Sequence, residues 1–264
     1  GLGDVYKRQT ISRTSFISNT ASQDGGAIFN DGELTISQSS IISNSAAMDG
    51  GGIYNDQILT AINSTFSGNV ADIVSGEGGG LMNNDTADLD HVTIANNVAA
   101  LGAGVGSTAS AGINTVLYAT LIVSNSGGND LQLGASGTPT NTFASAGYNV
   151  IGTMGDNINL SGSADITDVT DSQVESLANN GESMLTHAPL ITSQAIDRAD
   201  GGNCPSTDQQ DIARPLDGNG DATAICDSGA FEASGIAPIN IYINDSQSFE
   251  GDSNSVGMTF TTVS

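Results

Sequence analysis

The six-residue stretch GGGIYN at residues 50–55 decides the fold, because the chain repeats it. Similar stretches read GGAIFN at 25–30, GGGLMN at 78–83 and GAGVGS at 102–107. A second phrase places an aliphatic residue or Phe three positions before an Asn. Its asparagines are Asn19, Asn44, Asn69, Asn97 and Asn125, separated by 25, 25, 28 and 28 residues. A nearly constant period of this size predicts a solenoid.

The residues between the two phrases predict strands. Segments such as LTISQSS and HVTIANN are rich in Thr, Ser, Val, Ile and Asn, and glycines separate them. About 25 residues suffice to connect two parallel strands, and such crossovers are almost always right-handed. We therefore expect an all-β fold: a right-handed parallel β-helix, with coils of about 25 residues and an irregular C-terminal cap region.

The repeated Asn predicts a ladder along the coil axis. A side-chain amide can donate to one neighbour and accept from another, so stacked asparagines satisfy each other at a buried turn. We expect this structural role for Asn19, Asn44, Asn69 and Asn97. The glycines fit corners that need positive φ or close approach between coils, so valine at Gly51 or Gly79 should strain a corner. Ligand or metal binding by these residues is the alternative, and it would require every copy to bind.

The composition limits the classes of partner. The formal net charge is −24, from 29 acidic residues against five Lys and Arg. This charge disfavours nucleic acid and anionic membrane surfaces and favours cations, including calcium. Only 38% of residues are hydrophobic and Trp is absent, which fits a coil whose core is one side chain deep. We expect no membrane span, and a monomeric segment of a larger chain.

Changes in pattern along the chain predict its organisation. The opening GLGDVYKRQ fits no coil, so residues 1–9 are interpreted as non-native linker or adaptor sequence. Regular coils are expected over 10–128, and an irregular continuation and cap over 129–233. Residues 234–264 form a separate segment whose alternation suits antiparallel strands. We also expect truncation at both ends.

Two cysteines, Cys204 and Cys226, lie 22 residues apart in a loop-rich region. In an exported protein they would form a disulfide, and closing a loop of this size stabilises the fold by about 3 kcal/mol. Free or metal-ligating thiols are the alternative, although no His or third Cys lies nearby to complete a zinc site. A disulfide would indicate an oxidising location.

One motif has the spacing of a calcium loop. DGNGD at 217–221 places oxygens at Asp217, Asn219 and Asp221, the first three ligand positions. Ala222 and Ser228 then stand where such a loop needs Gly and Glu. A plain acidic turn is therefore the alternative, and calcium is a possible cofactor.

Other polar residues have structural interpretations. Each of three acids follows an Asn at the end of a glycine phrase and is expected in a solvated turn: Asp31, Asp56 and Asp85. His91 is expected to point outward from a strand, as a lone His without a special role. His187 is expected to be structural, since no acid or nucleophile partner for it is evident in the sequence. Arg214 is expected to pair with a nearby acid, such as Asp211 or Asp227.

Several phrases resemble known families. FISN, FSGN and GGAI, over residues 10–125, resemble the polymorphic outer-membrane protein repeat of bacterial surface proteins. GYNVIG, LANNGESMLTHAPL, SQAID, ARPLDGNGD and CDSGAFE, in this order, resemble the choice-of-anchor Q domain. INDSQSFEGDSNS is similar to the opening of a Calx-beta domain, a calcium-associated β-sandwich module. These resemblances imply a bacterial exported surface protein, often with further modules and an anchor downstream, and they imply no catalytic site.

The leading hypothesis is a non-catalytic extracellular β-helix segment of a large bacterial surface or secreted protein, serving as adhesin, stalk or display scaffold. Its partner would be an extracellular glycan or protein surface. The alternative is a carbohydrate-active enzyme, either a polysaccharide lyase or a hydrolase, or a glycan-binding module, because parallel β-helices also carry these functions. Three or more converging Asp, Glu, Arg or Lys side chains in a concave face would favour the enzyme.

Overall fold

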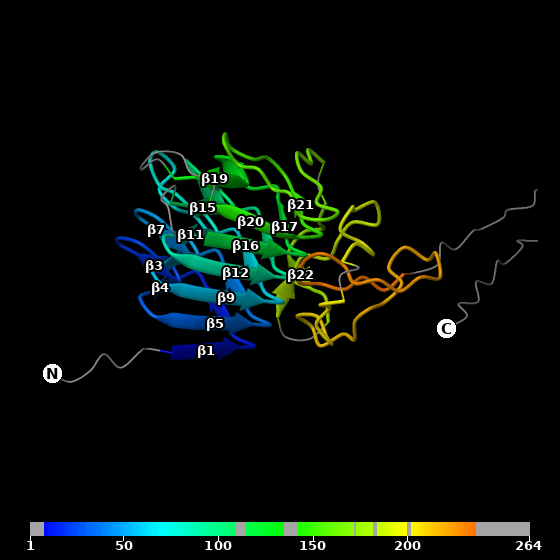
Figure 1. Cartoon of the computed structure of the whole chain (residues 1–264). Coiled ribbons are helices and arrows are strands. Elements are labelled where there is room, and N and C mark those ends of the chain that lie inside the picture. The colour runs from blue at the N-terminus through cyan, green and yellow to red at the C-terminus, as the bar shows by residue number, and fades with distance from the viewer. Residues whose placement is uncertain are drawn as a thin grey trace, which may run out of the picture.

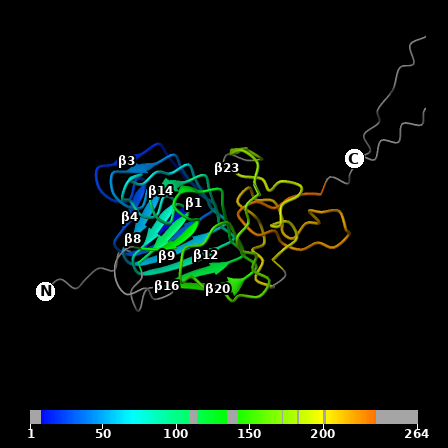
Figure 2. The same ribbon diagram turned by 90° about the horizontal axis from the view of Figure 1, so that it is seen from above.

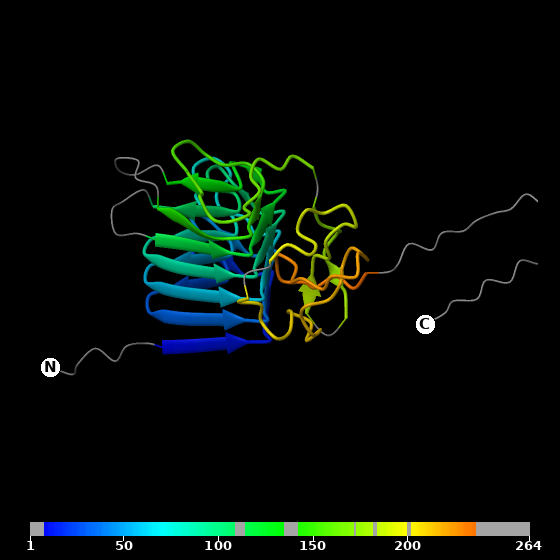
Figure 3. The same cartoon turned by 45° about the vertical axis from the view of Figure 1, so that its right-hand side comes forward.

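The computed structural model describes residues 8–108, 114–134, 142–171, 173–181, 184–199 and 202–235. Within these ranges the chain contains strands and no helix. Its parallel sheets stack as a β-solenoid of about five turns, roughly 27 residues apart. Figures 1 and 3 show the strands climbing one above another from the N-terminal side. The predicted all-β parallel coil is confirmed, and its hand stays a prediction.

Three parallel sheets form the sides of the coil, visible from above in Figure 2. The first sheet contains β1 (Arg8–Ser12), β5 (Glu33–Ser37), β9 (Ile58–Ile62), β12 (Thr86–Asp90), β16 (Asn114–Tyr118) and β20 (Phe143–Gly147). The second sheet contains β2 (Ser15–Ile17), β6 (Ser40–Ile42), β10 (Thr65–Ser67), β13 (Thr93–Ala95), β17 (Leu121–Val123) and β21 (Val150–Ile151). The third sheet contains β4 (Ile28–Asn30), β8 (Ile53–Asn55), β11 (Leu81–Asn83), β15 (Val105–Ser107) and β19 (Leu131–Leu133).

Short strand pairs complete the coil. Two of them are parallel and follow the second sheet along the chain: β3 (Thr20–Ala21) with β7 (Ser45–Ala46), and β14 (Val98–Ala99) with β18 (Ser126–Gly127). A third pair, β22 (Ala178–Asn179) with β23 (Leu185–Thr186), is antiparallel and lies in the C-terminal region.

The strand register reproduces the columns of the sequence. In the second sheet Phe66 lies between Ile41 and Ile94, and in the third Leu81 lies beside Ile53. All of these side chains are fully buried in one continuous core that runs along the axis. Because each coil places the same class of side chain at the same depth, apolar burial continues from coil to coil.

A single left-handed residue turns the chain from the first sheet to the second in successive coils. The corner residues are Arg13 (φ 50°), Gln38 (φ 45°), Asn63 (φ 45°), His91 (φ 50°), Ala119 (φ 45°) and Tyr148 (φ 63°). The expectation that places His91 in a strand is therefore wrong. The residue lies at a corner and is fully buried.

The glycine pairs serve two different needs at the corner before the third sheet. Gly78 has φ +68°, a left-handed conformation that most side chains disfavour. A Cβ on the next residue, Gly79, would lie 2.4 Å from the carbonyl oxygen of Ala103 in the following coil. The first glycine provides the turn and the second permits close approach between coils.

The first coil begins earlier than the sequence pattern indicated. Arg8 and Gln9, assigned above to linker sequence, form the start of β1 and lie in register with Glu33 and Leu34. Parallel pairing uses backbone groups, so it needs no repeat phrase in the paired residues. The Arg8 guanidinium also forms an ion pair with Glu33. Residues 1–7 lie outside the described ranges.

The C-terminal region first continues the coil and then runs beside it. Strands β19, β20 and β21 add to the three sheets, and Ile166 bridges to Val150 one level further. Residues 184–199 and 202–232, here called the flank segment, then lie against the second sheet, as the yellow and orange ribbon in Figures 1 to 3 shows. The predicted irregular cap therefore contains a long segment packed along the side of the coil.

Candidate functional site

Stacked asparagines form a ladder at the corner after the second sheet. The side-chain Nδ2 of Asn44 donates to Oδ1 of Asn69 at 2.9 Å, and Asn69 donates likewise to Asn97 at 2.9 Å. Asn19 and Asn97 make the same bond to the next rung. Each Oδ1 along the ladder also accepts the backbone N–H of the preceding asparagine, for example Asn44 N to Asn69 Oδ1 at 3.0 Å. The four predicted asparagines and Asn125 thus satisfy one another and the turn.

Asp130 terminates this ladder. Its Oδ1 accepts from the backbone N and the Nδ2 of Asn125, and its Oδ2 accepts from the backbone N and hydroxyl of Thr153. The residue is only 3% exposed. A carboxylate can accept on both sides but cannot donate to a further rung, so it ends the series.

A second ladder follows the third sheet. Nδ2 of Asn30 donates to Oδ1 of Asn55 at 2.6 Å, Asn55 donates to Asn83 at 2.7 Å, and Asn83 donates to the hydroxyl of Thr115 at 2.8 Å. The sequence signal for it is the Asn that ends each glycine phrase. Asparagine therefore forms hydrogen-bonded ladders at two corners of the coil.

The flank segment covers the outer face of the second sheet with polar contacts. The hydroxyl of Thr65 donates to Oε1 of Gln209 at 2.6 Å, and Nε2 of Gln209 donates to the hydroxyl of Ser40 at 2.9 Å. Nearer the following coils, the backbone N–H of Ala230 donates to the hydroxyl of Thr93. Outward side chains of β6, β10 and β13 are consequently buried. This face of the coil is unavailable to a partner while the flank segment is in place.

Ser67 and His187 form the arrangement most similar to a catalytic dyad. Oγ of Ser67 lies 2.8 Å from Nε2 of His187, and Nδ1 of His187 lies 2.7 Å from the carbonyl oxygen of Glu175. That carbonyl can only accept, so Nδ1 carries the proton and Nε2 accepts from the serine. Sequence spacing could not reveal this pair, because 120 residues separate its members.

Burial gives the pair a structural role. Ser67, on β10, is 3% exposed, and His187, in the flank segment that covers this strand, is 1% exposed. Burial also lowers the pKa of His187, while the backbone bond to Glu175 acts in the opposite direction. A substrate has no path to a serine that is covered in this way. The bond joins β10 to the flank segment.

Arg214 occupies the centre of a buried charged cluster in the flank segment. Its guanidinium donates to the carbonyl oxygens of Asp227 (2.9 Å) and Gly229 (2.8 Å), and it lies 3.5 Å from Oε2 of Glu232. The ion-pair partner is thus Glu232, whereas Asp211 pairs with Arg13 at 2.5 Å. The expectation that Arg214 pairs with a nearby acid is confirmed, but the acid is Glu232 and not one of the two suggested, because Arg214 reaches the backbone of Asp227 instead.

The acids of this cluster hold backbone amides. Asp208 accepts from three N–H groups, those of Gln210, Ile212 and Glu232. Asp227 accepts from the N–H groups of Asp197 and Ala233. Burial and, next, the charge of Glu232 raise the pKa of Asp227 to about 8, against the lowering effect of these amides and of Arg214. The cluster organises irregular backbone where no sheet is available to do so.

His91 lies close to this cluster. Its Nδ1 donates to Oδ1 of Asp90 at 2.5 Å, its ring meets Tyr118 edge to face, and its buried Nε2 has no hydrogen-bond partner. Burial lowers the pKa of His91, and the neighbouring Arg214 lowers it further, whereas Asp90 raises it. Both histidines of the chain are therefore buried between the coil and the flank segment.

The structure places the three predicted calcium ligands in one exposed turn. Asp217 accepts from the backbone N–H groups of Gly220 and Ala222, at 2.7 and 2.8 Å, Asn219 accepts from that of Asp221, and Asp221 from that of Thr223. These bonds shape the turn. Within the described ranges, no three His, Cys, Asp or Glu side chains converge as metal ligands would. Calcium binding at this turn stays a prediction.

Cys204 and Cys226 form the predicted disulfide, with their Cα atoms 6.2 Å apart. The bond closes the loop that carries the DGNGD turn. Ala199 bridges to Cys226, which connects this loop to the rest of the flank segment. The disulfide is confirmed, and it supports an oxidising location.

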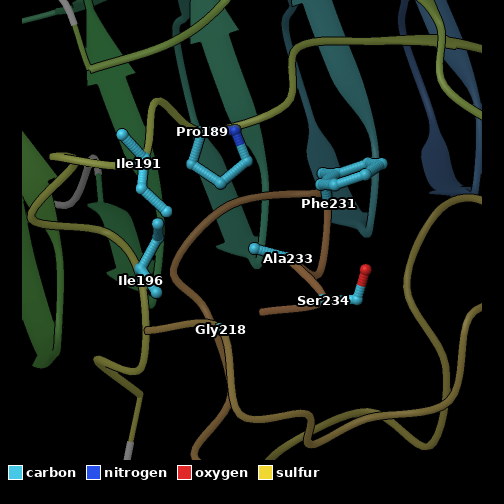
Figure 4. Close-up of a pocket in the computed structure, with 7 residues that line it drawn as sticks. All are labelled: Pro189, Ile191, Ile196, Gly218, Phe231, Ala233 and Ser234. Carbon is cyan, nitrogen blue, oxygen red and sulfur yellow. The ribbon is translucent and has the colours of Figure 1, made fainter. Parts of the chain in front are cut away.

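An apolar pocket opens within the flank segment and just beyond it (Figure 4). Its walls are formed by Pro189, Ile191, Ile196, Gly218, Phe231, Ala233 and Ser234, around a volume of about 220 Å³. No ionisable side chain is among them. The pocket lacks the acids and bases of a hydrolytic site.

A family model described as the Chlamydia polymorphic membrane protein repeat matches residues 13–31. This stretch runs from the first corner to the end of the first glycine phrase and includes β2, β3 and β4. The match supports polymorphic membrane protein-like β-helix repeats, and it is consistent with a cell-surface location. No curated protein and no solved structure matches the chain. None of the described residues belongs to a helix that could cross a membrane.

Proposed function

We propose that this chain is an extracellular β-helix segment of a bacterial surface or secreted protein and works as a non-catalytic scaffold for adhesion or display. The repeat match at residues 13–31 supports the surface assignment. The disulfide between Cys204 and Cys226 supports export, because such bonds persist in oxidising compartments.

The observation that carries the scaffold role is the bonding of the buried polar groups. Asn69 bonds to the coils before and after it, Ser67 bonds to His187 across the flank interface, and Arg214 bonds to backbone carbonyls. These groups are occupied in holding coils and segments together. Partners then meet surfaces that the flank segment leaves uncovered, among them the outer faces of the first and third sheets and the turns between sheets.

The finer resemblances extend this proposal. The phrases over 147–232 support a choice-of-anchor Q-like module, and in the structure this region supplies the end of the coil and the flank segment. Such a module would connect the coil to further exported domains. The Calx-beta-like stretch and its possible calcium sites begin beyond Gly235 and lie outside the described ranges.

The following experiment distinguishes a non-catalytic scaffold from a carbohydrate-active enzyme. The purified chain is incubated with a panel of acidic and neutral polysaccharides, with and without calcium, and new reducing ends or unsaturated sugars are measured. We expect no products. Beads coated with the chain are then applied to surfaces carrying extracellular proteins or glycans, and we expect retention on some of them. Product formation that Ser67→Ala abolishes would overturn the proposal and assign a hydrolase.

A further inference from the structure

The turn between β10 and β11 is longer than its counterparts. In the coil before it, three residues separate Ala46 from Gly50, whereas six separate the equivalent Ala71 and Gly78. The extra length accounts for the change of the Asn spacing from 25 to 28 residues at this point. The core columns on either side keep their register. The insertion is therefore not needed to build the coil.

This turn exposes two adjacent aliphatic side chains. Val74 is 84% exposed and Ile73 is 69% exposed, and Met48 of the preceding coil is 49% exposed. Met48 lies against the turn, because its carbonyl oxygen accepts the N–H of Asp72. Single exposed apolar residues are ordinary, but a contiguous group at the end of an inserted turn is typical of an interaction site. Ile73, Val74 and Met48 are called the apolar tip below.

The apolar tip has a defined backbone. Oδ1 of Asp72 accepts the N–H of Val74 at 2.7 Å, and the carbonyl of Asp72 accepts the N–H of Gly76 at 2.8 Å. The carbonyl of Gly76 in turn accepts from Leu101 in the next coil. A side chain at Gly76 would meet Asp72 N at 2.5 Å, so the turn is also closely packed. A preorganised turn loses little conformational entropy on binding.

Carboxylates surround the apolar tip. Asp24 and Asp49 precede the corner glycines of successive coils, and Glu77 follows in the third. They form a column in which Asp24 accepts the N–H of Asp49 and Asp49 accepts that of Glu77. Burial raises the pKa of Asp49, and the charges of Asp24 and Asp72 raise it further. These carboxylates therefore interact electrostatically. Each arginine of the described ranges bonds elsewhere: Arg8, Arg13, Arg198 and Arg214.

We propose that the apolar tip is a docking site for a protein that offers an apolar pocket bordered by Lys or Arg side chains. Branched aliphatic side chains fill protein pockets, whereas sugars are held by aromatic faces and polar groups, so a protein fits better than a glycan. The acidic border repels anionic membranes, and a second copy of this chain would bring the same negative charge. The inference rests on the proposed adhesive function and names the class of partner.

The test uses two variants of the whole chain. Ile73→Ser/Val74→Ser removes the aliphatic groups of the apolar tip, and Ile191→Ser, at a residue 76% exposed on the flank segment, is the matched control. Wild type and variants are applied to an array of purified extracellular proteins, and the affinities of bound proteins are measured at low and high salt. Phosphatidylcholine and phosphatidylglycerol vesicles form a second arm.

We expect at least one array protein to bind the wild type and to lose roughly tenfold or more in affinity with Ile73→Ser/Val74→Ser, with no loss for Ile191→Ser. High salt should weaken that binding, because the charges around the tip are only partly buried and salt screens them. Equal binding by wild type and tip variant would overturn the docking site and leave the adhesive function standing. Absence of any bound protein, or binding to vesicles instead, would also overturn it.

Discussion

Replacing Asn69 by alanine tests the ladder at its central, fully buried rung. Asn69 is fully buried, its Oδ1 accepts from the backbone N and the Nδ2 of Asn44, and its Nδ2 donates to Asn97 and to the carbonyl of Ile41. Alanine keeps the backbone and removes these four bonds. Two donors of Asn44 then lie in the coil interior without an acceptor.

The expected loss follows from those two donors. Leaving a buried donor unsatisfied costs about 1–3 kcal/mol, so Asn69→Ala should lower the free energy of unfolding by about 2–6 kcal/mol. The same substitution at Asn19 is the control. Asn19 is exposed, and its removal leaves Oδ1 of Asn44 with the backbone N–H of residue 19, at 2.9 Å. Asn19→Ala should therefore cost less than about 1 kcal/mol.

The assay is urea unfolding of both variants and the wild type, followed by far-ultraviolet circular dichroism. Because solenoids can unfold in parts, hydrogen exchange of the amides in β6, β10 and β13 is measured beside it. Asn69→Ala should lose protection in these strands first. Equal losses for Asn19→Ala and Asn69→Ala would refute the reasoning, since position in the ladder would then be irrelevant.

Four further outcomes are expected. Gly79→Val should cost about 3 kcal/mol or more in urea unfolding, because its Cβ would lie 2.4 Å from a backbone oxygen, and an unchanged midpoint would contradict this. Burial lowers the pKa of His187 in the folded chain, so its contribution to stability is complete above pH 6.5 and declines below it. Unfolding midpoints between pH 7 and 5 should then fall less for His187→Gln than for wild type. Cys204→Ser should make the flank segment susceptible to protease while the coil resists, with a stability loss of about 3 kcal/mol. Arg214→Met should cost about 3–5 kcal/mol by leaving Glu232 buried without its partner, and a smaller loss in a double variant with Glu232→Gln would show the coupling.

The coil could be predicted from the sequence because the residues that form it recur in short phrases at a nearly constant spacing. Each column in the sequence, such as Ile41, Phe66 and Ile94, became a row of adjacent residues in one sheet. The spacing of Cys204 and Cys226 likewise predicted their bond. A column of one residue type in the sequence predicts that coils stack along an axis, because each residue of the column then contacts the equivalent residues of the neighbouring coils.

The flank segment was not predictable from its own residues. Many of its contacts to the coil join residues more than 100 positions apart, such as Thr65 with Gln209, and no repeat marks them. One signal was present in the coil itself. Strands SII at 40–42 and LIV at 121–123 carry apolar residues on both faces, which a strand with one solvated face does not need. Such strands indicate that another segment packs on the outer face of the sheet, although they do not identify that segment.

The corners were missed for a different reason. Residues such as Gln38, Asn63 and His91 adopt left-handed conformations that sequence reasoning reserves for glycine. The stacked backbone around each corner fixes its neighbours, and the coil tolerates the local strain. His91 was expected in a strand for this reason, whereas it occupies a corner, where it is buried.

The direction of the asparagine ladder makes the two ends of the molecule electrically different. Every rung from Asn19 to Asn125 donates toward the later coil, so the amide dipoles add along the axis with their positive ends toward Asp130. A negative group at the positive end is the favourable arrangement known from helix N-termini. Duplication of a whole coil between these residues would lengthen the row without altering its polarity. The ladder thus permits different numbers of coils, and so different lengths of the solenoid, whereas the carboxylate of Asp130 fixes where the ladder ends.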